Sequence, residues 1–397
     1  MSGPAVPDEY PRAPLLLVAS SSRTGPAEGQ IALARCLRAS GIDARIAADS
    51  VRPGDIGAQL EQAGVPFARA LKLSRQVRLA DVLSDVRTLR AWLREGKPDL
   101  LHAAFAHDHW VCLWAARKLG AAGEGLRIVR TAHRASDATA GALSWRRRLF
   151  ARTDGVIVHS EMYRKRLLGL GLDPRRVLAA PGGVDAQRFT PGRAPELRRE
   201  WGVPEGAPLA GIVARMKPER GHEELLRAWA RAVEQVPEAR LVLVGRGEHE
   251  QRLREVAAEL HVAGSVVFGG YRTGAGLVEA YRALDVAIWL REGNDGASRG
   301  VLEAMACGVP VVVGNEGAPP ELVAPASGAP CGRIVDPRDP LEIAAALGQL
   351  LSDQARARRL GEAARARAGE LTPDRFAAAA RAFYRAVREL PPAVSRG

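Results

Sequence analysis

Short apolar segments of strand length alternate with helical segments along most of this chain. In the first half, the segments predicted as strands are 15–20, 44–47, 99–103, 127–131 and 155–159, and a helical pattern covers 28–38. This alternation constrains the fold strongly, because strands separated by helices form a parallel sheet with both faces covered. The first half therefore predicts an α/β domain.

The same alternation begins again near residue 190, after a stretch rich in proline and glycine. The second set of predicted strands is 209–214, 240–244, 265–268, 286–290 and 309–313. A chain of 397 residues also exceeds the size at which one hydrophobic core usually stops growing. We therefore predict an N-terminal tail (1–14), a first α/β domain (15–190), a second α/β domain (191–372), and a C-terminal helix and tail (373–397).

Composition and charge exclude several classes of protein. The chain has 57 Lys and Arg against 45 Asp and Glu, and this balance suits nucleic acid, anionic lipid or phosphorylated substrates. Aromatic residues do not alternate with the basic clusters, which argues against nucleic acid. No apolar run has the length of a membrane span, and the first residues lack a signal-peptide pattern. Four scattered cysteines without a C-x-x-C pair, Cys36, Cys112, Cys307 and Cys331, indicate reduced thiols and a cytoplasmic protein.

The most informative motif brackets a glycine-rich turn with two carboxylates, Asp295 and Glu303. The composition of 293–300 favours a turn with free backbone amides, and 301–307 is predicted as a helix. Glu303 would then lie in the first helical turn, where the helix dipole favours its ionised form. A carboxylate there can accept hydrogen bonds from the vicinal hydroxyls of a ribose, and Asp295 can do the same for a sugar ring. The motif predicts a sugar-nucleotide site.

This motif resembles the signature of the GT-B glycosyltransferases of family 4, the group 1 retaining enzymes. The shared pattern is an acid, seven residues, Glu, and then Ala-Met-Ala-x-Gly-x-Pro-Val-Val, with Asp295 here in place of the usual Glu. The resemblance implies two Rossmann-like domains facing across a cleft, with the last helix returning to the first domain. It implies that Glu303 holds the ribose and that Asp295 contacts the transferred sugar. The donor-binding residues that it implies in this motif are Asp295, Gly296, Ala297, Ser298, Gly300, Val301, Leu302 and Glu303.

Two arginines follow the predicted strand 209–214. The family has Arg, four residues and Lys-Gly here, so Arg215 matches and Arg220 replaces the lysine. A transferase that breaks a sugar-diphosphate bond must neutralise charge on the leaving group, with a metal or with two cations. Since the chain contains no Asp-x-Asp motif, we predict no metal and no cofactor, and we expect Arg215 and Arg220 to bind the diphosphate and act in catalysis.

Three further residues lie at strand ends of the first domain. His133 follows the strand 127–131, where the family places a histidine near the reacting carbon, so we predict a catalytic role; a structural hydrogen bond is the alternative. His102 and Asp108 are predicted to contact the acceptor. A metal site built from histidines 102, 107 and 109 is less favoured, because they have no helical i, i+4 register and no cysteine among them.

Weaker signals complete the predicted donor site. Gly25 stands where the family has a Gly-Gly loop, and Gly245 and Tyr271 follow strands on the expected base side of the nucleotide. Residues 144–152 combine arginines with Trp and Phe. That segment fits either peripheral contact with an anionic membrane or an ordinary amphipathic helix.

All of these residues follow predicted strands, and ligands of open α/β sheets bind beyond the carboxyl ends of strands. We therefore expect a metal-independent, retaining transferase that moves a sugar from a UDP-, GDP- or ADP-linked donor to a glycan or lipid-linked acceptor, as in assembly of lipopolysaccharide or glycolipid of the cell envelope. We expect it in the cytoplasm, or peripherally at the inner face of the membrane. A nucleotide-sugar epimerase and a non-catalytic nucleotide-sugar-binding protein are the alternatives.

Overall fold

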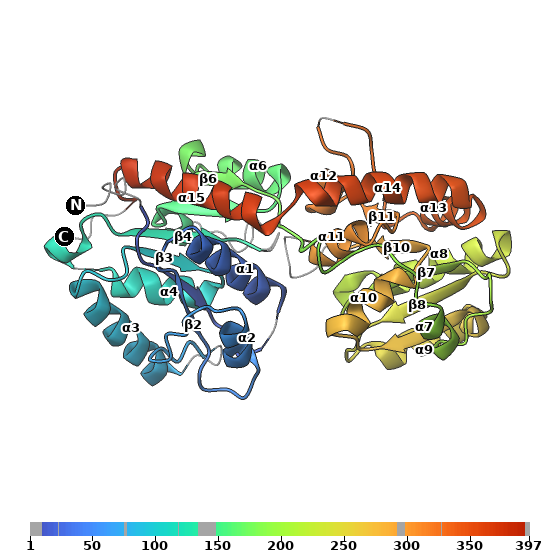
Figure 1. The fold of residues 1–397 in the computed structure, drawn as a ribbon, viewed down its shortest axis with the longest axis horizontal. Coiled ribbons are helices and arrows are strands. Elements are labelled where there is room, and N and C mark those ends of the chain that lie inside the picture. The colour runs from blue at the N-terminus through green and yellow to red at the C-terminus, as the bar shows by residue number, and fades with distance from the viewer. Residues whose placement is uncertain are drawn as a thin grey trace, which may run out of the picture. The chain divides into compact units, whose positions relative to one another are not determined.

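The described part of the chain forms two compact α/β units (Figure 1). The computed structural model describes residues 10–22, 24–74, 78–117, 119–133, 148–291, 298–326 and 328–393. Of these, the residues up to Gly182 and those from Pro373 onward belong to unit 1, and those from Gly183 to Thr372 belong to unit 2.

Unit 1 contains a six-stranded parallel sheet with the order β2-β1-β3-β4-β5-β6. Its strands are β1 (Pro14–Val18), β2 (Arg45–Ala48), β3 (Leu100–Ala103), β4 (Arg127–Thr131), β5 (Gly155–Val158) and β6 (Val177–Ala179). Side chains alternate between two apolar layers: Leu16 belongs to the layer under the first and last helices, and Leu17 to the layer on the other face. Helices on both faces explain why these strands are apolar without interruption.

The helices of unit 1 are α1 (Gly25–Ala39), α2 (Ile56–Gln62), α3 (Leu79–Arg94), α4 (Ala106–Ala115), α6 (Glu161–Gly169) and α15 (Pro373–Glu389). Helix α15 comes from the end of the chain and lies beside α1 (Figure 1). Arg127 binds the carboxyl-terminal end of α15: its guanidinium donates to the carbonyls of Val387, Arg388 and Leu390 at 3.1, 2.6 and 2.9 Å. The predicted return of the last helix to the first domain is confirmed.

Unit 2 contains a second six-stranded parallel sheet with the order β12-β11-β10-β7-β8-β9. Its strands are β7 (Leu209–Val213), β8 (Arg240–Val244), β9 (Val266–Gly270), β10 (Val286–Trp289), β11 (Val311–Gly314) and β12 (Gly332–Val335). The first strand, β7, lies in the middle, and the chain adds strands first on one side and then on the other. The carboxyl ends of β7 and β10 therefore flank the switch point where ligands of such sheets bind.

The helices of unit 2 are α7 (Pro195–Glu200), α8 (His222–Gln235), α9 (Glu250–Glu259), α10 (Gly274–Arg282), α11 (Arg299–Ala306), α12 (Pro319–Val323), α13 (Pro340–Ser352) and α14 (Gln354–Glu370). They enclose the sheet in one continuous apolar core. Among the described residues, no helix combines the length and the apolar character that crossing a membrane requires. Two strands were not predicted from the sequence, β6 and β12, which are short and lie at sheet edges.

Candidate functional site

The loops after β7 and β8 are in backbone contact at the carboxyl edge of the unit 2 sheet. The amide of Met216 donates to the carbonyl of Arg246 at 3.1 Å. A Cβ at Gly245 would lie 1.9 Å from the carbonyl oxygen of Ala214, and one at Gly247 would lie 2.0 Å from that of Met216. Only glycine permits this approach. The Gly-x-Gly pattern thus has a structural cause, since it fixes the loop that carries Arg215.

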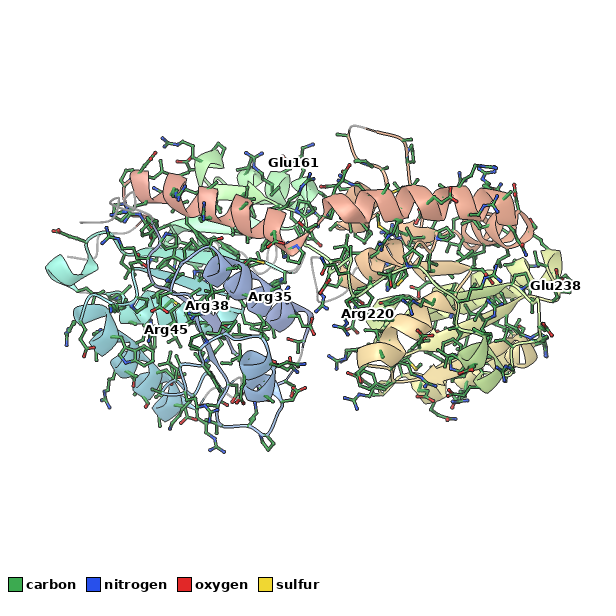
Figure 2. All side chains as sticks on the ribbon, viewed as in Figure 1. Arg35, Arg38, Arg45, Glu161, Arg220 and Glu238 are labelled. Carbon is green, nitrogen blue, oxygen red and sulfur yellow. The ribbon has the colours of Figure 1, made fainter. Side chains whose placement is uncertain are left out.

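Arg215 and Arg220 both lie in the segment that follows β7. Arg215 is exposed; the pKa of Glu248 is lowered chiefly by backbone hydrogen bonding and by Lys217, and the charge of Arg215 adds a smaller effect in the same direction. Arg220 ends a short 3-10 turn and is half-buried (Figure 2). The next residue, Gly221, has φ +77, and a Cβ there would lie 2.9 Å from Cγ of Arg291. The segment therefore brings two guanidiniums to the switch-point edge of the sheet.

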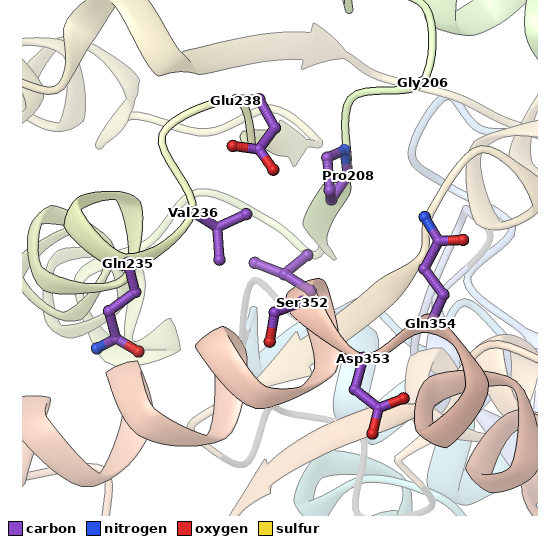
Figure 3. Close-up of a pocket in the computed structure, with 9 residues that line it drawn as sticks. Gly206, Pro208, Gln235, Val236, Glu238, Ser352, Asp353 and Gln354 are labelled. Carbon is purple, nitrogen blue, oxygen red and sulfur yellow. The ribbon is translucent and has the colours of Figure 1, made fainter.

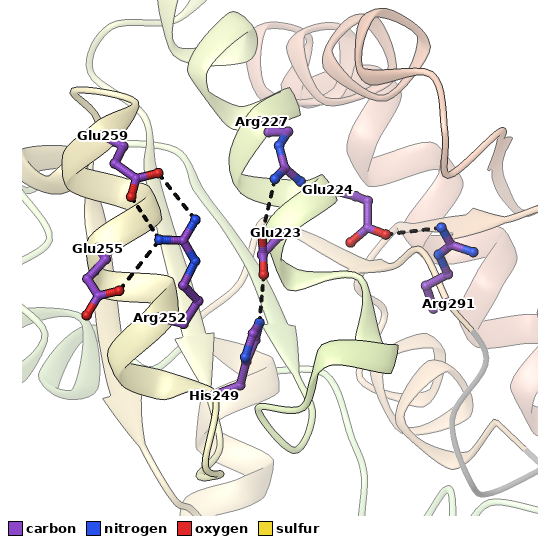
Figure 4. A network of polar contacts seen from close by, with 8 residues as sticks. All are labelled: Glu223, Glu224, Arg227, His249, Arg252, Glu255, Glu259 and Arg291. Atoms are coloured by element: carbon purple, nitrogen blue, oxygen red, sulfur yellow. Dashed lines mark hydrogen bonds and ion pairs between the residues drawn. The ribbon is translucent and has the colours of Figure 1, made fainter.

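The first turn of α8 is held by ion pairs to neighbouring loops (Figure 4). Glu223 accepts from Nε2 of His249, in the loop after β8, at 2.9 Å, and Glu224 pairs with Arg291, in the loop after β10, at 3.0 Å. His222, the first residue of the same helix, is buried. Burial, and then the charges of Arg220 and His249, lower the pKa of His222 to about 4. His222 is therefore a neutral side chain beneath the cationic loop, a position that the sequence did not indicate.

Glu303 lies in the second turn of α11, and the prediction that it lies in the first turn is wrong. The helix begins at Arg299 instead of Val301, because Ser298 takes a left-handed conformation (φ 51) and is the N-cap residue. The helix dipole acts mainly within the first turn. Two side chains hold the carboxylate instead: the hydroxyl of Tyr281 donates to Oε2 at 2.8 Å, and Arg299 donates to Oε1 at 3.0 Å.

The side chains of the other predicted donor residues differ in exposure. Val301 and Leu302 are buried in the core of unit 2, and a Cβ at Gly300 would lie 3.0 Å from the ring of Trp289. Tyr271 is exposed, and the guanidinium of Arg246 lies 4.2 Å from the centre of its ring. The predicted residues Asp295, Gly296 and Ala297 lie outside the described residues.

His102 of unit 1 is fully buried, with both ring nitrogens in hydrogen bonds. Nδ1 lies 2.8 Å from the hydroxyl of Tyr384 in α15, and Nε2 lies 2.7 Å from Oγ1 of Thr131. Burial is the main reason that the pKa of His102 is lowered to about 3. Neither nitrogen is left for an acceptor or a metal ion, so we do not retain His102 in the proposed site.

Asp108 is buried at the start of α4, where its Oδ2 accepts from the amide of Phe105 at 3.0 Å. Burial raises its pKa, while hydrogen bonds from the backbone of Ala19 and Phe105 act in the opposite direction. Its neighbour His109 lies 2.7 Å from Oγ1 of Thr153. The bond to Phe105 caps the start of α4, and because the Asp108 side chain is fully buried we do not retain it as an acceptor contact.

His133 follows β4 at the carboxyl edge of the unit 1 sheet and is buried there. Its ring centre lies 5.4 Å from that of His159, which in turn lies 5.7 Å from that of Phe376 in α15. Gly25 is the first residue of α1, preceded by the N-cap residue Thr24. Both predicted residues thus lie at the edge where the strands of unit 1 end.

A cavity of about 570 Å³ lies at the other end of unit 2 (Figure 3). It is lined by Pro208, which precedes β7, by Glu238, which precedes β8, and by the junction of α13 and α14. Figure 2 shows Glu238 and Arg220 at opposite ends of unit 2. This cavity is separate from the candidate site. Over the residues that the structure describes, no three His, Cys, Asp or Glu side chains form a group that could hold a metal ion.

Two family models match the chain in succession. Residues 27–188 match the Glycosyltransferase Family 4 model, and residues 194–367 match the model of Glycosyl transferases group 1. A D-inositol 3-phosphate glycosyltransferase of Corynebacterium jeikeium is 36% identical over 56% of this chain and 54% of the relative, so the chain spans about half the length of this relative. A GDP-mannose-dependent alpha-mannosyltransferase of Mycobacterium tuberculosis is 32% identical over 73% of this chain and 75% of the relative.

Solved structures show the same architecture. The Anabaena protein HepE, in complex with UDP-glucose, has a TM-score of 0.76 and 20% identity, with 92% of this chain and 97% of HepE covered. This likeness shows the GT-B fold, and the matches cover both units. The predicted family is confirmed: the chain belongs to the group 1 glycosyl transferases, family 4, and has the GT-B fold.

Proposed function

We propose that the chain is a metal-independent, retaining glycosyltransferase that moves a sugar from a nucleotide-diphosphate donor to an acceptor hydroxyl. The observation that carries this proposal is the buried Glu303 carboxylate on α11, the helix after β10, which is held by Tyr281 of α10 and by Arg299 of α11. A fixed carboxylate at a switch point is suited to the two hydroxyls of a ribose. Family membership supports the same role.

In this proposal the cations after β7 act on the leaving group. The bond between the anomeric carbon and the diphosphate oxygen breaks, and negative charge grows on the diphosphate. Arg215 and Arg220 neutralise that charge with charge-assisted hydrogen bonds, which substitute for a metal ion. Asp295 and its loop hold the transferred sugar, and His133 hydrogen-bonds near the reacting carbon. The acceptor oxygen forms the new bond to the anomeric carbon on the face that the diphosphate leaves, and its proton passes to the departing diphosphate oxygen, so the configuration is retained.

The donor nucleotide, the acceptor and the cellular location are proposed only as broad classes. One relative is named for inositol 3-phosphate, another is named for GDP-mannose, and the HepE structure holds UDP-glucose, so we propose a GDP- or UDP-linked donor and an acceptor from glycolipid or cell-envelope assembly. In the segment predicted to contact membrane, Arg148 and Arg152 are exposed while Leu149 and Phe150 are buried, as in an ordinary amphipathic helix, so the proposed contact with an anionic surface rests on the exposed arginines alone. The cysteines are free thiols, which supports a cytoplasmic location.

Replacement of Arg220 by methionine tests the proposal. We expect turnover of the sugar donor to fall by about 100-fold, because one of two charge-assisted contacts to the leaving group is lost. The matched control is Arg338→Met, which removes an exposed arginine of the same unit that pairs with Glu316. The assay measures release of UDP or GDP with a glycolipid acceptor present, with and without EDTA, and NMR gives the anomeric configuration of the product.

The same assay separates the alternatives. Epimerised donor without acceptor would indicate an epimerase, and tight nucleotide-sugar binding without turnover would indicate a binding protein. Loss of turnover on addition of EDTA, or an inverted product, would overturn the metal-independent or the retaining part of the proposal.

A further inference from the structure

Tyr281 is a buried side chain outside the signature motif that contacts the candidate ribose-binding acid. It lies near the end of α10 and is 1% exposed. The ring is enclosed by two aromatic neighbours, with centres 5.9 Å away for Phe189 and 6.4 Å away for Trp289. Because the ring cannot shift and the hydroxyl is shielded from water, the hydroxyl has a fixed direction, toward Glu303.

Burial and the adjacent Glu303 carboxylate raise the pKa of Tyr281 well above its ordinary value. The phenol is therefore protonated at neutral pH and acts as a donor. A neutral donor in this position stabilises a carboxylate acceptor, and a hydrogen bond to a charged group is stronger than one between neutral groups.

Arg299 holds the other oxygen of the same carboxylate. It is the first residue of α11, one turn before Glu303, and its guanidinium lies 3.0 Å from Oε1. The terminal torsion of a glutamate is broad, so a carboxylate with one partner can still rotate. Partners on both oxygens fix the plane of the group, and each oxygen keeps a second lone pair for a further donor.

We propose that Tyr281, together with Arg299, is a positioning residue that orients the Glu303 carboxylate to receive the two ribose hydroxyls of the donor. The inference rests on the proposed function and names the residues by which that site distinguishes a ribose. Orientation before binding reduces the entropy lost when the nucleotide docks. The effect must therefore depend on the ribose hydroxyls and vanish for a nucleotide that lacks them.

The experiment measures dissociation constants by calorimetry for UDP, GDP and their 2′,3′-dideoxy analogues. For the wild-type protein, we expect the better of the two nucleotides to bind about 100-fold more tightly than its dideoxy form, since two hydrogen bonds to a charged group are lost. We call the dissociation constant of the dideoxy form divided by that of the parent nucleotide the ribose ratio. In Tyr281→Phe the ribose ratio should fall about tenfold while the affinity for the dideoxy form stays unchanged. Arg299→Met should lower the same ratio, and it provides a second variant should Tyr281→Phe not fold.

The matched control is Tyr384→Phe in unit 1, which removes a buried tyrosine hydroxyl whose bond to His102 has the same length of 2.8 Å. Its ribose ratio should equal that of the wild type. An unchanged ratio in both Tyr281→Phe and Arg299→Met would overturn the inference and leave the proposed function standing. A wild-type protein that binds UDP and GDP without ribose dependence would overturn the role of Glu303 and this inference. Failure of the wild type to bind either nucleotide would overturn the proposed function itself.

Discussion

Each unit of this protein buries a tyrosine hydroxyl against a polar side chain, but only one of the two pairs keeps positions that can bind a ligand. In unit 1, Tyr384 and His102 lie 2.8 Å apart, and in unit 2, Tyr281 and Glu303 lie 2.8 Å apart. The histidine is neutral and has both nitrogens engaged, so it joins α15 to the sheet and has nothing left to bind. The carboxylate keeps lone pairs beyond its two partners, and it stands at the switch point of its sheet.

The comparison shows that burial alone does not separate a structural polar residue from a binding one. Both residues are nearly inaccessible, His102 at 0% and Glu303 at 6% exposed. What separates them is the number of hydrogen-bonding positions that remain after the protein's own contacts are counted. The following predictions test this distinction, beginning with the largest effect.

Replacement of Glu303 by glutamine should lower sugar transfer by 100-fold or more, on the order of 3 kcal/mol of donor binding and transition-state stabilisation. The amide keeps the size of the side chain and can still accept from Tyr281, but it loses the ion pair with Arg299, so the free energy of unfolding should fall by about 1–2 kcal/mol, much less than would unfold the protein. The measurement compares kcat/KM for the donor with the urea midpoint. Glu250→Gln, which changes an acid paired with Arg254 on the exposed face of α9, is the control. Full activity in Glu303→Gln would remove the distinction between the two pairs.

Replacement of His102 by leucine should lower the stability of the protein and leave nucleotide binding unchanged. It leaves the hydroxyls of Tyr384 and Thr131 without their partner, so the free energy of unfolding should fall by about 2–3 kcal/mol. The dissociation constants for UDP and GDP should not change, because neither nitrogen of His102 is available to a ligand. Urea unfolding and calorimetry measure the two quantities. A stable variant with weaker acceptor binding would restore the acceptor role that the sequence suggested for His102.

The sequence predicted the sheets well because buried parallel strands are continuous apolar runs. It also predicted the return of α15, through the resemblance to the family. It did not predict β6 or β12, because both are short and only partly buried: β6 has one buried residue, and β12 is buried only at its first and last residues.

The candidate site was predicted less completely, because its geometry depends on contacts distant in sequence. Position at a strand end suggested that His102 binds a ligand, but its partner Tyr384 is 282 residues away. Tyr281 was missed for the same reason, since it belongs to another βα unit than Glu303. The contact of Arg299 with Glu303 could have been predicted from the sequence, because Arg299 stands four residues before Glu303 and residues at this spacing meet on a helix face. The start of α11 was misplaced because nothing in the sequence marked Ser298 as left-handed.

The smallest predicted effect concerns acid stability, to which both units contribute through buried neutral histidines. Burial lowers the pKa of His102 to about 3 and that of His222 to about 4. An unfolded histidine, with a pKa of about 6.5, takes up a proton as the pH falls, and the folded one does not until its lowered pKa is reached. Each therefore costs about 2 kcal/mol of stability between pH 7 and pH 5.

The test uses the difference in unfolding free energy between pH 7 and pH 5, measured with urea. This loss should be smaller by about 2 kcal/mol in His102→Leu than in the wild type, and by a similar amount in His222→Leu. Asp85 and Asp108 have raised pKa values, so they gain stability on acidification, but their contributions cancel when the same pH difference is compared between variants. An unchanged pH difference in His102→Leu would mean that the folded His102 takes up a proton between pH 7 and pH 5 as an unfolded histidine does, and is charged at pH 5. Its Nδ1 and Nε2 would then both donate, to the Tyr384 and Thr131 hydroxyls, and unit 1 would contain a buried charge as unit 2 does.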